Sequence, residues 1–209
     1  MSLDAPAYVL LEDGARFDGV ACAADEVAVG EIVFTTSMSG YQEAVTDPSY
    51  AGQLLVFTFP QIGNYGVRSE AMESDRVHAR AAIMRAAVDR EDAPGAEQGW
   101  LSWLEVCGVP CITEVDTRAL VRHIRRQGAM RGGLFPARMC EREARVLIEA
   151  EPPMTGRDLV PEVSSARAAR PITMPTAERI PRDRRPIRRL SGSSKSASNC
   201  SASSALQFG

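Results

Sequence analysis

Two short apolar runs, Ile32–Thr35 and Leu54–Phe59, stand out from the polar residues around them. Both are rich in β-branched or aromatic side chains, a pattern typical of buried strands. The segment between them is polar and contains Asp-Pro-Ser at positions 47–49, which favours a turn. A second loop, Pro60–Gly66, follows the second run. Because strands that lead into polar loops often present a site, we expect Gly30–Gly66 to organise the chain.

The first apolar positions predict a hairpin followed by another strand. Tyr8–Leu11 and Ala15–Val20 are β-prone, and the intervening Asp-Gly pair at positions 13 and 14 supplies the positive φ of a tight turn. The next strand is expected at Val27–Phe34, with an interruption near Gly30. The region Arg76–Val88 stays open, because its alternation suits a strand while RAAIMRAAV also suits a helix. A polar loop is expected at residues 89–98.

Two helices are predicted in the second half of the body. In Trp100–Val106, both tryptophans and Leu104 fall on one face, and we interpret the tryptophans as core or interface residues rather than ligand contacts. Asp116 is a suitable N-cap for the second helix, and Gly128 a suitable stop. Its apolar stripe comprises Leu120, Val121 and Ile124. Its last turns carry Arg122, Arg125 and Arg126, which complement the helix dipole.

Three further elements complete the body. Short strands are expected at Pro110–Val115 and Ala129–Phe135, the latter with a bulge or a close backbone approach at its Gly-Gly pair, residues 132 and 133. A last helix is expected at Glu141–Ala150. Its predicted packing residues are Ala144, Val146, Leu147 and Ile148.

Charge divides the chain into two parts. Through Val163 there are 15 arginines and 25 acidic residues, a net charge of −10, whereas the rest carries +7. From Ser164 onward, apolar periodicity is lost and a Ser/Ala-rich stretch follows, so we expect disorder. Arginines at positions 182–189 could attract phosphate, but no aromatic side chains are interleaved, and nucleic-acid binding is the disfavoured alternative.

The chain shows no apolar run long enough for a membrane span and no signal-peptide pattern, so a cytoplasmic protein is expected.

The five cysteines predict neither a disulfide framework nor a metal site. They are Cys22, Cys107, Cys111, Cys140 and Cys200. Their number is odd, their spacing is irregular, and only His78 and His123 could join them as nitrogen ligands. We therefore expect buried, inert thiols and no bound metal.

Several long segments resemble one family in the same order. They are YVLLEDGARFDG, the whole of residues 30–66, CITEVDTRALVRHIRRQGAMRGGL and GRDLVPEVS. Together they resemble the N-terminal domain of the small subunit of glutamine-hydrolysing carbamoyl phosphate synthetase, over roughly residues 7–164. The resemblance implies an α+β fold of mixed sheets with the swivelling β/β/α architecture, and a strand at the centre of residues 76–88. We place the resembling domain at 1–152 and a linker at 153–180, and the basic, Ser/Ala-rich composition predicts a disordered tail at 181–209.

Ser49 is the candidate site residue. It lies in TDPSY, and the resemblance implies that its hydroxyl contacts bound glutamine at the boundary with the glutaminase domain. The residues alone favour a plain turn. No catalytic residue is expected: neither histidine has triad context, and the family's cysteine elbow and its His and Glu partners have no counterpart in these 209 residues. The loop Pro60–Gly66 lacks the Lys-Ser/Thr of a phosphate cradle.

The resemblance implies a role in a two-subunit ligase. The parent enzyme makes carbamoyl phosphate from glutamine, bicarbonate and ATP for arginine and pyrimidine synthesis. The small subunit releases ammonia, and the large subunit, the expected partner, holds ATP and metal; no cofactor is expected here. This chain would keep the docking domain. The alternative is a truncated, non-catalytic interaction module, with a frameshift beyond about Ile180 as one origin.

Overall fold

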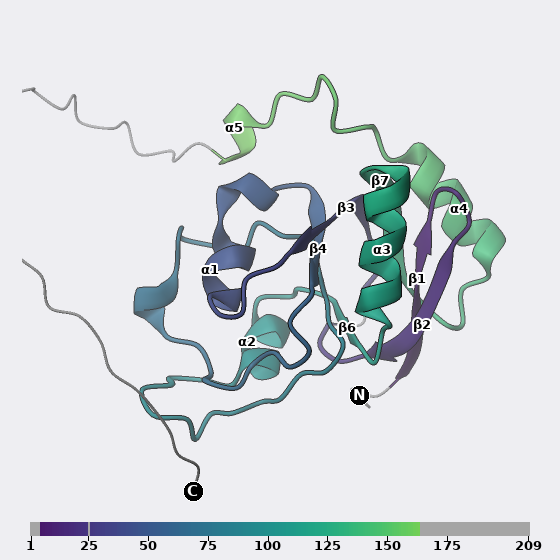
Figure 1. Cartoon of the computed structure of the whole chain (residues 1–209). Helices are drawn as coiled ribbons and strands as arrows, with labels where there is room; N and C mark the ends of the chain where they lie inside the picture. Colours follow the sequence, from purple (N-terminus) through teal and green to yellow (C-terminus); the bar gives the residue numbers. More distant parts are fainter. Residues whose placement is uncertain (1–4, 25, 164–209) are drawn as a thin grey trace, which may run out of the picture. The chain divides into compact units, whose positions relative to one another are not determined.

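A computed structural model describes residues 5–24 and 26–163 (Figure 1). Its strands are β1 (Ala5–Leu11), β2 (Arg16–Ala21), β3 (Ala28–Thr35), β4 (Gln53–Phe57), β5 (Ala81–Ile83), β6 (Cys111–Thr113) and β7 (Met130–Pro136). The helices are α1 (Tyr41–Thr46), α2 (Trp100–Val106), α3 (Thr117–Gln127), α4 (Glu141–Ala150) and α5 (Val160–Val163). Short 3-10 turns lie at η1 (Pro48–Tyr50) and η2 (Ser69–Ala71).

The seven strands close into one barrel in the order β1-β2-β6-β5-β4-β3-β7. The pairs β3–β4, β4–β5 and β5–β6 are parallel, and the others are antiparallel. The connections allow these parallel pairs: α1 lies between β3 and β4, α2 lies between β5 and β6, and a long loop with η2 joins β4 to β5. The expected mixture of helices with a mixed sheet is confirmed.

Period-two burial divides the core into three clusters. On β4, Leu54 and Val56 face one cluster, which also receives Leu120 and Ile124 of α3. The intervening Leu55 and Phe57 face a second cluster beneath α1 and α2. A third cluster joins β1 and β7 to α4. Strands buried on both faces read as continuous apolar runs, which explains the unbroken pattern of β4.

Most of the predicted elements are present. The ambiguous region holds strand β5, and α2 has the bounds expected for it. The Asp116 carboxylate accepts from the Ala119 amide at 2.9 Å, and Gly128 ends α3 with φ 100°. The Gly-Gly pair in β7 is a close approach: a Cβ at Gly132 would lie 2.5 Å from Ile32 Cδ1.

Three local predictions were wrong or incomplete. β3 runs through Gly30 without a break, because Gly30 pairs with Gly132 on β7 in regular register. The polar segment after β3 forms α1, since Gly40 at φ 79° starts a helix whose buried residues include Tyr41 and Val45. The helix α5 was not expected either.

Two expectations about packing also need correction. On α4 only Ala144 and Ile148 are buried, whereas Val146 and Leu147 are 59% and 40% exposed. The helix contacts the barrel along one i, i+4 line, so its other apolar residues face outward. The expected burial of the thiols holds for two of the four described cysteines, and Cys107 and Cys140 are exposed because they lie at helix ends.

The predicted tail at 181–209, its expected disorder and most of the linker lie outside the described residues. Among those described, no helix is both long and apolar enough to span a bilayer.

Candidate functional site

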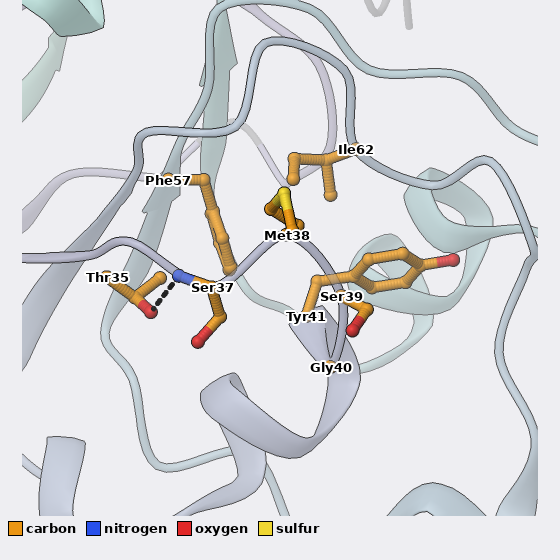
Figure 2. A pocket seen from close by; sticks show the side chains of 8 residues that line it. All are labelled: Thr35, Ser37, Met38, Ser39, Gly40, Tyr41, Phe57 and Ile62. Carbon is orange, nitrogen blue, oxygen red and sulfur yellow. Dashed lines mark hydrogen bonds between the residues drawn. The ribbon is translucent and has the colours of Figure 1, made fainter. Parts of the chain in front are cut away.

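The site begins where β3 ends. Ser37 donates its amide to Thr35 Oγ1 at 3.3 Å, and the chain then turns through Met38 and Ser39 into α1. Figure 2 shows a shallow recess at this turn, with the Phe57 ring and the Tyr41 side chain on its sides. Met38 is 76% exposed, so an apolar side chain is presented at the mouth of the recess.

Aromatic side chains fix α1 against the loop that follows β4. The rings of Tyr41 and Tyr65 stack at 4.3 Å, and the edge of Trp100 meets Tyr41 at 4.8 Å. The Tyr41 hydroxyl donates to the carbonyl of Gly66 at 2.6 Å, while the Tyr65 hydroxyl accepts from the Gly40 amide at 2.6 Å. Burial raises the pKa of both phenols, so both hydroxyls stay protonated at physiological pH.

Gln42 makes a second link to this loop, and we call it the Gln42 clamp. Its side-chain amide donates to the Arg68 carbonyl at 2.8 Å, and its carbonyl oxygen accepts from the Arg68 amide at 2.9 Å. Gln42 is 2% exposed, so these bonds satisfy groups that water does not reach. This role could not be recognised from the sequence, where Gln42 is only a polar residue next to Tyr41.

The end of α1 is tied down in the same way. The fully buried Thr46 hydroxyl donates to the Gln42 carbonyl at 2.9 Å and accepts from the Glu73 amide at 3.0 Å. The Thr46 carbonyl accepts from the Ser74 hydroxyl at 2.7 Å. The chain therefore leaves α1 in a fixed direction toward the turn that carries Ser49.

Ser49 lies exposed in the middle of η1. Its amide donates to Asp47 Oδ1 at 2.8 Å, which is the turn geometry that Asp-Pro-Ser favours. Its hydroxyl makes no hydrogen bond with any residue that the structure describes. The turn reading of Ser49 is thus correct, and the same turn leaves the hydroxyl open to solvent.

His123 pairs with the turn between β1 and β2. His123 Nε2 lies 2.6 Å from Asp13 Oδ2, and its ring meets Phe17 edge-on, so the imidazole is both hydrogen-bonded and packed. Although burial opposes the charged form of Asp13, the Ala15 amide and His123 bonds together lower its carboxyl pKa.

Two of the four described thiols have a raised pKa. Cys22 and Cys111 contact each other at 2.7 Å, and that hydrogen bond and burial raise the pKa of Cys111. Burial also raises the pKa of Cys107. Within residues 5–24 and 26–163, no group of three or more potential ligands could hold a metal ion.

A second polar feature lies along α3, which runs beside β4 (Figure 1). We call it the α3 groove, a hollow of about 350 Å³. It is lined by Thr58, Thr117, Arg118, Val121, Arg122 and Arg125. The helix-dipole interpretation of Arg122 and Arg125 did not foresee it. The i, i+4, i+7 spacing from Arg118 was the available signal, but Thr58 comes from another part of the chain.

Comparison with known proteins adds a family to this geometry. Residues 9–134 match the model of the CPSase domain of the carbamoyl-phosphate synthase small chain. The carbamoyl phosphate synthase small chain of Caldanaerobacter subterraneus is 44% identical to this chain over 125 residues. That of Nostoc sp. is 42% identical to this chain over 161 residues. These matches cover 60% and 77% of this chain.

The chain spans less than half of these relatives, namely 35% of the Caldanaerobacter protein and 42% of the Nostoc protein. Among solved structures, an aminopeptidase from Aneurinibacillus sp. strain AM-1 aligns with a TM-score of 0.35 and 14% identity, over 63% of this chain and 30% of that one. That likeness is too low to bear on the fold. The family match runs from within β1 to within β7 and includes every element between them, and on this ground the chain belongs to the carbamoyl-phosphate synthase small chain family.

Proposed function

We propose that this chain is the docking part of a glutamine-dependent carbamoyl phosphate synthetase, and that it joins the large subunit in making carbamoyl phosphate for arginine and pyrimidine synthesis. The observation that carries the proposal is the family match, which spans the barrel and the elements that position Ser49. The swivelling β/β/α architecture and a cytoplasmic location belong to the same proposal.

In this proposal Ser49 contributes to glutamine binding when a glutaminase domain is supplied. Its exposed hydroxyl can donate to a carboxylate and accept from an ammonium group. Support comes from its setting: Thr46 and the Gln42 clamp fix the helix that precedes η1, so the hydroxyl is held on a rigid turn. Rigid placement lowers the entropy cost of binding.

We infer that the described residues supply no nucleophile for the amide bond. Among the described residues, the two exposed thiols lie at helix ends, and the two buried ones contact each other. We infer that the 209 residues alone do not hydrolyse glutamine, and that ATP and metal are held by the large subunit.

A binding and activity experiment tests the proposal. The 209-residue chain is mixed with the cognate large subunit, and calorimetry measures the affinity while a coupled assay measures glutamate release. We expect a stoichiometric complex without glutamine turnover. Absence of binding would reject the docking role, and glutamate release by the purified chain would reject the missing-nucleophile inference.

The alternative, an interaction module with no share in glutamine use, differs in one outcome. If a separate glutaminase domain is added to the complex, Ser49→Ala should raise the KM for glutamine with little change in kcat under the proposal. The alternative predicts no effect of Ser49→Ala. Ser102→Ala, on α2 and outside both the recess and the Ser49 turn, serves as the matched control.

A further inference from the structure

The α3 groove gathers positive charge that has no partner within the described structure. Arg118, Arg122 and Arg125 are exposed, and none makes a hydrogen bond or ion pair with a described residue. No carboxylate lines the groove. Elsewhere in the body, several arginines are paired; for example, Arg80 and Arg131 contact glutamates at 2.8 and 2.9 Å.

Helix stability does not account for these three arginines. Arg118 lies in the first turn of α3, where the helix dipole disfavours positive charge. Arg118 and Arg122 are four residues apart, so like charges face each other on one side of the helix, which is destabilising. Arg125 in the last turn is favourable, but Arg126 supplies that effect too. The pattern is explained when an anionic group outside the described residues binds there.

The spacing of the arginines indicates the kind of anion. From Arg118 to Arg125 the helix rises by about 10 Å, which is several times the width of one carboxylate or phosphate group. Guanidinium groups bind carboxylates in a bidentate, planar geometry. The Thr58 and Thr117 hydroxyls add uncharged donors, and Val121 forms an apolar floor. This combination fits two or more carboxylates presented by a protein segment.

We propose that the α3 groove is the docking surface for a carboxylate-bearing segment of the large subunit. The inference rests on the proposed function, because it assigns a surface to the docking already proposed. A protein partner fits better than a nucleic acid, since the body through Val163 carries a net charge of −10 and repels a long polyanion.

The test compares charge reversals inside and outside the groove on the same helix. The double variant Arg122→Glu, Arg125→Glu should weaken binding of the 209-residue chain to the large subunit by about tenfold or more. Arg126→Glu is the matched control, because Arg126 is exposed on α3 but does not line the groove. It should change the Kd by less than about threefold. Binding of the unchanged chain should weaken as salt is raised.

The outcomes separate this inference from the proposed function. If the unchanged chain binds and the double variant binds equally well while remaining folded by circular dichroism, the groove is not the docking surface, although the docking role stands. If the unchanged chain does not bind, both the docking role and the assignment of the α3 groove are rejected. Two results would overturn the proposal: inorganic phosphate stabilises the unchanged chain against heat, or the unchanged chain binds duplex DNA, and the double variant loses the effect. Either result would show that the groove binds an anion other than a protein segment.

Discussion

The α1 region and the outer face of α3 use polar residues in opposite ways. Around α1, Gln42 and Thr46 are buried, and each donates to and accepts from backbone groups at 2.8–3.0 Å. Along α3, three exposed arginines meet no described partner. Polar groups of the first kind shape the fold, because leaving them unpaired is costly. Those of the second kind are available for binding.

The contrast teaches that stability and binding are divided between different parts of this barrel. The aromatic cluster and the Gln42 clamp make the Ser49 turn rigid from within. In the α3 groove, Arg118 and its like-charge spacing to Arg122 do not stabilise the helix that carries them. If this division is right, changes at α1 should act on folding, and changes at the groove should act on association.

The largest effect is expected from the centre of the aromatic cluster. Trp100 is fully buried against Tyr41 and Phe57, so Trp100→Ala should lower the free energy of unfolding by about 3–5 kcal/mol. Val106→Ala is the control, since Val106 is 78% exposed on the same helix and should cost less than about 0.5 kcal/mol. Urea denaturation measures both. Similar losses for the two variants would break the distinction.

A smaller effect is expected from the Gln42 clamp. Gln42→Leu removes the acceptor of the Arg68 amide and one of the two donors to the Arg68 carbonyl, which keeps the Ala71 amide; the loss should cost about 1–3 kcal/mol. Amide hydrogen exchange at Arg68 should accelerate in this variant, because its protecting acceptor is gone. Gln127→Leu, at the exposed end of α3, should leave exchange at Arg68 unchanged. Unaltered exchange in Gln42→Leu would show that the clamp does not hold the loop.

The smallest effect is expected from charge reversals on α3. Arg118→Glu places an acid in the first turn of α3 and removes a like-charge pair, so it should raise the free energy of unfolding by about 0.5 kcal/mol. Arg126→Glu, in the last turn, should lower it by a similar amount. Thermal unfolding at low salt measures the difference. A destabilised Arg118→Glu would mean that Arg118 has a structural partner and that the groove is part of the fold.

Local physics let the sequence alone determine many elements. Asp116 and Gly128 fix the ends of α3 through cap chemistry, and the apolar face of α2 follows from its spacing. The strands were recognisable because β-branched runs were bounded by turn residues. Family membership could also be recognised from the sequence, and the match over residues 9–134 confirms it.

Other features required the tertiary structure, because they depend on distant segments. The continuity of β3 at Gly30 is decided by its partner Gly132 on β7. The exposure of Val146 and Leu147 is decided by how narrowly α4 meets the barrel. Closure of seven strands, the Gln42 clamp and the α3 groove all join residues far apart in the chain. Sequence periodicity reports which side of an element is apolar, whereas the fold alone decides what that side meets and which charges are left without a partner.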